Sequence, residues 1–372
     1  MQLAAQRAHL SALADADRLR TLTSRGGVDL SSNDYLALST APRMLAAAAD
    51  ALARGVAVGS GGSRLLRGND AEHEALEAEA ARFFGAETAL FFGSGYAANT
   101  ALLSAVPQPG DLVVHDALVH ASMHDGLRLG RAPCVAAAHG DAQAAGDAIA
   151  AWRAGGGTGT AWIAIESLYS MDGDLADVAA YAAVAERHDA MLIVDEAHAT
   201  GVWGDGGRGV AAALHGRANV ITLNTLGKAL GCEGALLCGP AIVRDFLVAR
   251  ARPFIFSTAP APLGAAIARE ALRIVVDEPE RRARLHTLIG AARRHLAPLG
   301  ARVESQIVPL VIGLDRDAMR VAAAVQAAGF DVRGIRPPTV PAGTARLRVA
   351  LTLHVGEAEI AALAAVLQEV LP

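Results

Sequence analysis

Lysine is almost absent from this chain of 372 residues. Of its 33 basic residues, 32 are arginine, and Lys228 is the single lysine. Arginine solvates a surface as well as lysine does, but a guanidinium stays protonated and cannot attack a carbonyl carbon. Chemistry that needs a primary amine side chain would therefore have to use Lys228. Composition alone also allows Lys228 to be a chance survivor on the surface.

Other scarce features exclude whole classes of protein. The three cysteines form no CxxC pair, which argues against a disulfide framework or a cysteine zinc site and favours a reducing cytoplasm. A net charge of −5 with no basic run gives no support for nucleic-acid binding. No apolar stretch reaches the roughly 18–20 residues of a membrane span. The polar N-terminus does not resemble a secretory signal. We therefore expect a cytoplasmic protein without nucleic-acid or membrane partners.

Hydrophobic residues make up 52% of the chain, enough for a large core. Short apolar runs alternate with helical patterns through the first two thirds of the sequence, which predicts an α/β fold whose mostly parallel sheet is buried on both faces. The predicted strands of this sheet are 89–92, 111–115, 161–166, 191–196, 219–224 and 234–239.

The pattern changes after about residue 255 to long helices and a few strands. The sequence thus predicts three parts. An N-terminal helix and arm cover residues 1–40, with the helix extending to about residue 25. A large α/β domain covers 41–255, and a smaller C-terminal α+β domain covers 256–372.

Two motifs place reactive side chains where predicted strands end. Lys228 lies in TLGKALG, and Asp195 and His198 lie in DEAHATG. Ligands of open α/β sheets bind at the carboxyl ends of strands, so Asp195 could meet a cationic ring nitrogen and His198 a neighbouring oxygen. A capping aspartate with a surface histidine is an equally weighted alternative. A metal site that adds Glu196 is less favoured, because adjacent strand residues point to opposite faces.

Three weaker signals complete the set. GSGYAAN (93–99) between a strand and a helix leaves backbone N–H groups for a phosphate, although it could be a plain turn. His120 follows a strand and could stack on an aromatic ring, although a lone histidine is more often structural. Arg346 and Arg348 alternate along one strand and could bind a carboxylate or form a solvated edge.

Taken together, these groups meet the requirements of pyridoxal phosphate chemistry: an amine, a carboxylate for the ring nitrogen, a stacking ring, a phosphate site and a carboxylate-binding arginine. A nicotinamide-binding domain is disfavoured, because GSGGSR (59–64) is the nearest glycine motif and no predicted strand precedes it.

The ordered motifs of the chain identify a family. They are NDYLAL (33–38), GSGGSR, HEALEAEAARFFG, FFGSGYAAN, ESLYSMDGD (166–174), DEAHATG and TLGKALG. In order and spacing, the chain resembles the α-oxoamine synthases, which are pyridoxal phosphate enzymes of fold type I. The resemblance runs from residue 33 to the C-terminus. It implies a mostly parallel central sheet flanked by helices, with a smaller C-terminal α+β domain.

The resemblance implies a role for each residue around the cofactor ring. Lys228 would form the imine with the cofactor aldehyde, and Asp195 would pair with the protonated ring nitrogen. His198 would contact the phenolic oxygen, and His120 would stack on the ring face.

The resemblance also implies contacts with the phosphate and the substrates. Gly95, Tyr96 and Thr225 would bind the phosphate, and Ser170 would lie below the ring. The amino-acid carboxylate would be bound by Arg348, or as second choice by Arg346, and the other substrate-binding positions are Asn33 and Thr352. The family builds its site at a homodimer interface, so GSGGSR and Thr352 are expected to reach the partner's site. No metal is expected.

The C-terminal segment GIRPPTVPAGTARLRVALT (334–352) resembles the members that condense L-alanine with a pimeloyl thioester, carried on CoA or acyl carrier protein. The alternatives are a relative that uses glycine and an acyl-CoA, and a protein of this fold that binds ligand without catalysis. Glu233, after the lysine, departs from the small or apolar residues usual there. This leaves acyl selectivity open.

Overall fold

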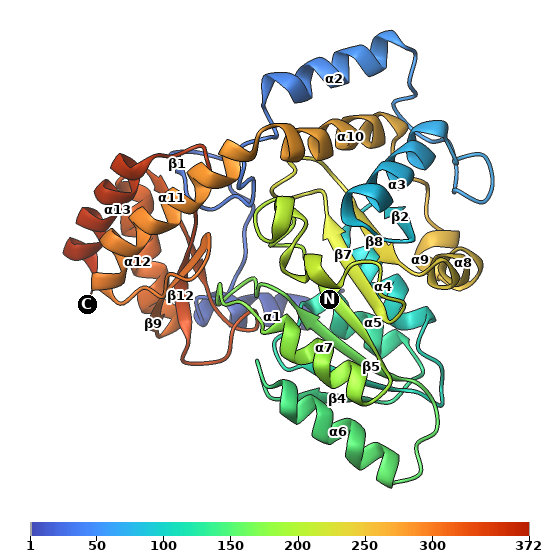
Figure 1. Cartoon of the computed structure of the whole chain (residues 1–372). Helices are drawn as coiled ribbons and strands as arrows, with labels where there is room; N and C mark the ends of the chain where they lie inside the picture. The colour runs from blue at the N-terminus through green and yellow to red at the C-terminus, as the bar shows by residue number, and fades with distance from the viewer. Residues whose placement is uncertain (1, 372) are drawn as a thin grey trace. The chain divides into compact units, whose positions relative to one another are not determined.

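The structure is a computed structural model that describes residues 2–371. It separates into two compact units (Figure 1). The larger unit consists of Leu36–Tyr169 and Leu175–Arg282. The smaller unit consists of the N-terminal residues up to Tyr35, the segment Ser170–Asp174 and the chain from Ala283 onwards.

The larger unit contains a seven-stranded sheet with the order β2-β8-β7-β6-β5-β3-β4. Strand β8 is antiparallel to both of its neighbours, and the other pairings are parallel. The mostly parallel sheet predicted from the sequence is therefore confirmed. The strands are β2 Thr88–Phe92, β3 Leu112–Asp116, β4 Cys134–Ala137, β5 Ala161–Glu166, β6 Ala190–Asp195, β7 Val220–Thr225 and β8 Ala235–Gly239.

Alternating residues along the strands pack into two separate hydrophobic cores, one on each face of this sheet. Val113 and Ile193 pack into one core, while Val114 and Leu192 pack into the other. The first face is covered by α4 Gly95–Ala105, α5 Ala121–Leu129, α8 Ala241–Arg250 and α9 Arg252–Ile255. The second face is covered by α6 Ala142–Ala154, α7 Val178–Arg187 and the 3-10 helix η2 Val210–Leu214.

The larger unit contains three further α-helices, α2 Pro42–Ala53, α3 Ala71–Phe84 and α10 Pro262–Asp277, and a short 3-10 helix, η1 Asp205–Gly207. Helix α10 packs against α2 and α3 (Figure 1). Arg43 of α2 pairs with Glu270 at 2.6 Å, and Arg269 of α10 pairs with Glu72 at 2.6 Å. These contacts assign α10 to the larger unit. The boundary falls at residues 282 and 283, within α11 Pro279–Leu296, whereas the sequence had placed it at 255.

The smaller unit has a three-stranded antiparallel sheet in the order β11-β12-β9 and a two-stranded pairing of β1 with β10. The β1–β10 pairing ties the N-terminal arm to the C-terminal part of the chain, so the arm is not a separate part. The strands are β1 Val28–Asp29, β9 Ile307–Gly313, β10 Phe330–Asp331, β11 Arg333–Ile335 and β12 Ala345–Ala350. The helices are α1 Ala4–Asp15, the part of α11 from Ala283 to Leu296, α12 Asp315–Ala327 and α13 Glu357–Val370, with a short 3-10 turn at Ala297–Leu299.

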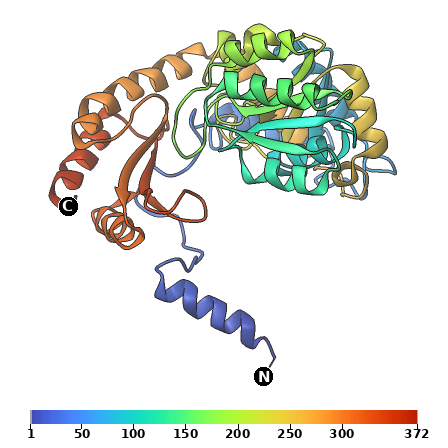
Figure 2. The same cartoon turned by 90° about the horizontal axis from the view of Figure 1, so that it is seen from below.

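Two elements differ from the sequence-based expectation. Helix α1 ends at Asp15, ten residues before the predicted end at 25, and stands apart from the small sheet (Figure 2). None of its residues is buried, so no packing offsets the entropy of a longer helix. Strand β4 was not predicted; it is an edge strand with three exposed residues, and its sequence, CVAA, contains a single β-branched residue. Within residues 2–371, no helix has the length and apolar character that a membrane crossing requires.

Glu196, which follows β6, fixes the segment that leads into η2. Its carboxyl group accepts hydrogen bonds from Ser167 Oγ at 2.6 Å and from the N–H groups of Val210 at 3.0 Å and Ala211 at 2.5 Å. Gly209 is required beside it, because a Cβ there would lie 2.6 Å from the carboxyl carbon and its φ is +98°. Complete burial raises the pKa of Glu196 to about 7, although these hydrogen bonds oppose the shift.

This raised pKa predicts a pH-dependent stability. An acid whose pKa is higher in the folded state stabilises most below its unfolded pKa, and the contribution is lost as pH rises towards 7. Between pH 5 and pH 8, the free energy of unfolding of the unmodified chain should fall by about 2 kcal/mol more than that of Glu196→Gln. Denaturant unfolding at both pH values measures this. Glu369→Gln, on the exposed surface of α13, is the control and should behave like the unmodified chain.

Candidate active site

A cavity of about 200 Å³ lies in the larger unit, where strands β5, β6 and β7 end. It brings together all of the predicted site residues that belong to this unit. Its lining residues are Gly95, Tyr96, Asn99, His120, Ser122, Glu166, Asp195, Ala197, His198, Leu223, Thr225 and Lys228.

Lys228 lies in the tight loop after β7, as TLGKALG predicted. Its Nζ atom is 2.9 Å from Nε2 of His198, and its carbonyl oxygen accepts the N–H of Gly231 at 2.8 Å. Gly231 has φ +63°, and a Cβ there would lie 2.4 Å from the backbone nitrogen of Ser39, so only glycine fits this turn. The loop thus holds the chain's single lysine side chain beside an imidazole.

Asp195 is the last residue of β6 and is 4% exposed. One carboxyl oxygen accepts the N–H of Ala197 at 2.8 Å, and the other accepts Nδ2 of Asn99 at 2.7 Å. The next residue, Glu196, turns towards Ser167 and η2 instead. Asp195, Glu196 and His198 therefore do not converge, and residues 2–371 contain no cluster of three or more metal-binding side chains.

The segment GSGYAAN forms the start of α4, as its small residues suggested. Ser94 caps the helix by accepting the N–H of Ala97 at 3.1 Å, which leaves the N–H groups of Gly95 and Tyr96 without helical partners. Thr225 lies opposite, since a Cβ on Gly95 would be 3.8 Å from its hydroxyl oxygen. These N–H groups, the hydroxyl and the positive helix terminus can together bind a phosphate.

The cavity is lined by three polar residues for which the sequence suggested no role: Asn99, Ser122 and Glu166. Glu166 ends β5 in register with Asp195 on β6 and is 3% exposed. Its Oε1 atom has no hydrogen-bond partner among residues 2–371. Burial, and then the charge of Asp195, raise the pKa of Glu166 well above its usual range. The position of Glu166 at a strand end was the only available signal for it.

The remaining predicted residues belong to the smaller unit. Arg348 donates from Nε to the carbonyl oxygen of Ser170 at 2.6 Å and from an Nη atom to Oδ1 of Asn33 at 3.1 Å. The structure therefore gathers Arg348, Ser170 and Asn33. Thr352 is completely buried and accepts the N–H of His354 at 3.3 Å.

The two arginines of β12 differ in their partners. Arg346 forms an ion pair with Asp172 at 2.5 Å and is 4% exposed. Arg348 is 7% exposed, yet within residues 2–371 no carboxylate forms an ion pair with it. Both side chains are buried, which removes the solvated-edge alternative. The unpaired charge of Arg348 makes it the better candidate for binding an anion.

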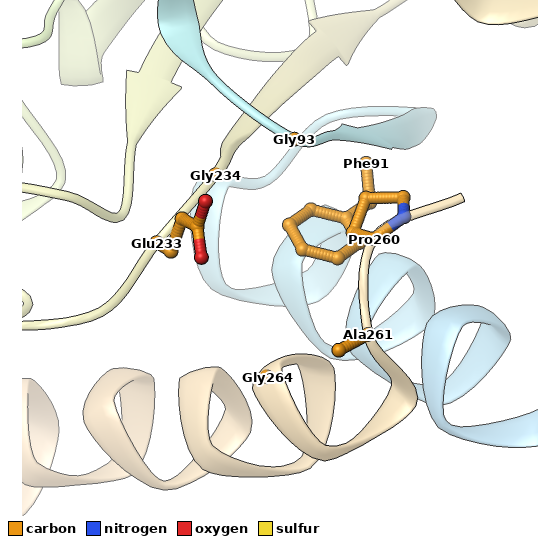
Figure 3. A pocket seen from close by; sticks show the side chains of 7 residues that line it. All are labelled: Phe91, Gly93, Glu233, Gly234, Pro260, Ala261 and Gly264. Atoms are coloured by element: carbon orange, nitrogen blue, oxygen red, sulfur yellow. The ribbon is translucent and has the colours of Figure 1, made fainter. Parts of the chain in front are cut away.

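Glu233 lines a different cavity of about 110 Å³ (Figure 3). Its carboxylate lies across from the rings of Phe91 and Pro260, and the remaining lining residues are Gly93, Gly234, Ala261 and Gly264. None of these residues lines the cavity around Lys228. The unusual charge after the lysine is therefore not part of the lining of the cavity that holds Lys228.

Comparison with known proteins identifies the family. Residues 25–367 match the family model "Aminotransferase class I and II", and the chain belongs to this family. It is 46% identical over 356 residues to the 8-amino-7-oxononanoate synthase of Anaeromyxobacter dehalogenans strain 2CP-1, covering 94% of this chain and 88% of that protein. It is 43% identical over 353 residues to the synthase of the same name from Mycolicibacterium smegmatis, covering 92% and 89%.

Solved structures agree with this assignment. The serine palmitoyltransferase of Sphingomonas wittichii superposes with a TM-score of 0.88 at 28% identity, covering 99% of this chain and 96% of that one. The 8-amino-7-oxononanoate synthase of Francisella tularensis superposes with a TM-score of 0.78 at 26% identity, covering 92% and 97%. A serine palmitoyltransferase that matches with a TM-score of 0.88 at 27% identity over 99% of this chain and 98% of that one was solved with bound pyridoxal phosphate. The predicted family and its fold type I architecture are confirmed.

The location of Glu166 generates a prediction about charge. Because a protonated carboxyl and an amide are both neutral and similar in shape, Glu166→Gln should leave the free energy of unfolding at pH 7.5 within about 0.5 kcal/mol of the unmodified chain. Glu166→Ala, which leaves a void, is the control that should lower it. If Glu166 were ionised beside Asp195, Gln would relieve a repulsion between like charges, and Glu166→Gln would be clearly more stable.

Proposed function

We propose that this chain uses pyridoxal 5'-phosphate to condense L-alanine with a pimeloyl thioester. The products are 8-amino-7-oxononanoate, CO2 and the free thiol carrier, in biotin biosynthesis. The observation that carries the proposal is the placement of the single lysine in one cavity with Asp195, His198 and His120. Relatives named for this activity, at 43–47% identity over most of the chain, point to the same reaction.

The residues of the cavity fit this cofactor. Lys228 offers a primary amine for the aldehyde, Asp195 offers a buried carboxylate for the ring nitrogen, and the start of α4 offers N–H groups for the phosphate. No ion pair satisfies Asp195 within the described residues, so a buried cationic ring nitrogen would compensate its charge. His198 and His120 would contact the phenolic oxygen and the ring face.

Bound pyridoxal phosphate supplies an electron sink for negative charge on the α-carbon of the amino acid. Lys228 would hold the cofactor covalently through its amine. Its Nζ atom, which lies 2.9 Å from Nε2 of His198, would take the proton from the α-carbon as general base. Asp195 would keep the ring nitrogen protonated, which makes this removal of a proton possible.

Arg348 is proposed to bind the carboxylate of the amino acid. It is a buried cation whose hydrogen-bond partners Ser170 and Asn33 are neutral, so a carboxylate ligand would supply the missing charge. Asn33 and Ser170, which already contact it, would orient its guanidinium. Arg346 is held by Asp172 and is proposed to be structural. Thr352 remains proposed as a substrate contact.

The assembly and the carrier are also part of the proposal. The family resemblance supports a cytoplasmic homodimer in which GSGGSR reaches the partner's site. Thr352, expected to do the same, is completely buried within its own unit and presents no surface to a partner. The pimeloyl group would arrive on CoA or on acyl carrier protein. The competing reaction, glycine with an acyl-CoA, would use the same residues around the cofactor. The names of the relatives favour alanine.

Product identification tests the proposed reaction. Purified protein with pyridoxal phosphate, L-alanine and pimeloyl-CoA should release CO2 and free CoA, and mass spectrometry should detect 8-amino-7-oxononanoate. Lys228→Ala should give none, because no other lysine side chain can replace the amine. The same assay with pimeloyl-acyl carrier protein in place of pimeloyl-CoA shows which carrier the enzyme uses.

Two outcomes would contradict the proposal. A product formed only with glycine would favour the sister reaction. Failure of the unmodified protein to bind pyridoxal phosphate would favour a protein of this fold that lacks the chemistry.

Substitution of the two arginines of β12 should affect the enzyme in different ways. Arg348→Lys should raise the KM for L-alanine by roughly 10- to 100-fold, because a lysine loses charge-assisted bonds worth about 1.5–3 kcal/mol. Binding of pyridoxal phosphate should change little. Arg346→Lys is the matched control. It should lower the thermal stability of the protein and change the KM for L-alanine little. Steady-state kinetics with varied alanine and thermal unfolding measure both. Equal effects on KM would remove the distinction between the two residues.

A further inference from the structure

His120 caps helix α5 with its own imidazole ring. The residue precedes Ala121, the first residue of α5, and its Nδ1 atom accepts the backbone N–H of Ser122 at 3.2 Å. A backbone N–H can only donate, so Nδ1 must carry a lone pair and not a proton. The positive end of the helix opposes a charged imidazole at the same place.

A chain of hydrogen bonds connects this cap to Asp195. Nδ2 of Asn99 donates to Oδ2 of Asp195 at 2.7 Å and to Oγ of Ser122 at 3.1 Å. An ionised carboxylate only accepts, which fixes the orientation of the Asn99 amide. Oγ of Ser122 thus accepts from Asn99, and its own proton can go to Nδ1 of His120, 2.7 Å away. Asn99 and Ser122 are both fully buried, so water does not compete for these groups.

We propose that Asn99 and Ser122 are positioning residues that hold His120 as a neutral imidazole with its proton on Nε2. The inference rests on the proposed function, which places His120 on the face of the cofactor ring. A ring nitrogen protonated beside Asp195 makes that ring cationic, and a cationic imidazole stacked on it would be repelled. A neutral imidazole stacks without that cost.

The surroundings of His120 support the neutral form. Burial is the largest influence and lowers the pKa of His120, and the charge of Lys228 lowers it further, while Asp195 opposes both. The titratable groups around His120 are Tyr96, His124, Glu166, Asp195 and Lys228.

The tautomer can be read directly. In protein labelled with ¹⁵N-histidine and loaded with pyridoxal phosphate, long-range ¹H–¹⁵N spectra distinguish protonated from unprotonated ring nitrogens. The chain has 12 histidines, so His120 is assigned as the signal set lost in His120→Asn. We expect an unprotonated Nδ1 and a protonated Nε2 from pH 6 to pH 9. A proton on Nδ1 at pH 7 would overturn the proposal.

Paired variants test the roles of Ser122 and Asn99. Ser122→Ala removes the hydroxyl, and Ser122→Thr retains one. At pH 6.5 we expect Ser122→Ala to bind pyridoxal phosphate about three- to tenfold more weakly than Ser122→Thr, and at pH 8.5 about equally. Asn99→Ala should act in the same direction as Ser122→Ala. A weakening that is the same at both pH values would indicate a purely structural cap and overturn the proposal. Thermal unfolding identifies any variant that fails to fold, and the spectrum of the unmodified protein decides the tautomer in that case.

The same spectrum separates this inference from the proposed function. The contacts among His120, Ser122 and Asn99 exist without a ligand, so the tautomer should also be present before pyridoxal phosphate is added. Protein that shows the Nε2–H form but binds no cofactor would contradict the proposed function alone. Protein that binds the cofactor with His120 charged would contradict this inference alone.

Discussion

The buried carboxylate of Asp195 is the constraint on which the rest of the larger unit's site depends. It is 4% exposed and receives hydrogen bonds from Ala197 and Asn99, but no ion pair from the described residues. Hydrogen bonds alone leave most of the cost of burying a charge in place, so the site is suited to a ligand with a buried cationic group. Asn99 connects Asp195 to His120. The amide that donates to Asp195 also orients Ser122 and, through it, the ring of His120.

The smaller unit shows the same imbalance with the opposite sign. Arg348 is a buried cation that contacts only neutral oxygens, while its neighbour Arg346 is neutralised by Asp172. An anion buried in one unit and a cation buried in the other match the two charges that the proposed chemistry brings, a protonated ring nitrogen and an amino-acid carboxylate. An uncompensated buried charge lowers the stability of each unit. A ligand of opposite charge would remove this cost when it binds, which would increase its affinity.

Much of this could be predicted from the sequence, because strand ends of a parallel sheet are visible as apolar runs followed by polar motifs. Lys228, Asp195 and His198 were found in that way. Asn99 could not be, since its role arises from a contact with Asp195, 96 residues away, and nothing in an alanine-rich helix marks it. The boundary between the units was misplaced for a similar reason: the contacts that attach α10 to α2 and α3, such as Arg43–Glu270 and Arg269–Glu72, join residues that are 227 and 197 positions apart.

The scarcity of lysine also gains a physical explanation. Arg43 reaches Glu270, Asp277 and Glu278, and Arg269 reaches Glu72 and Glu79, so single guanidinium groups join two or three carboxylates across helices. The planar fork of arginine serves this purpose better than an ammonium, and permanent protonation is an advantage there. At Lys228 the requirement is reversed, because the proposed roles need a nitrogen that gives up its proton, attacks an aldehyde carbon and later accepts a proton. Arginine can replace lysine wherever a permanent positive charge is required. At the position of Lys228, the proposed chemistry requires a side chain that can lose its charge.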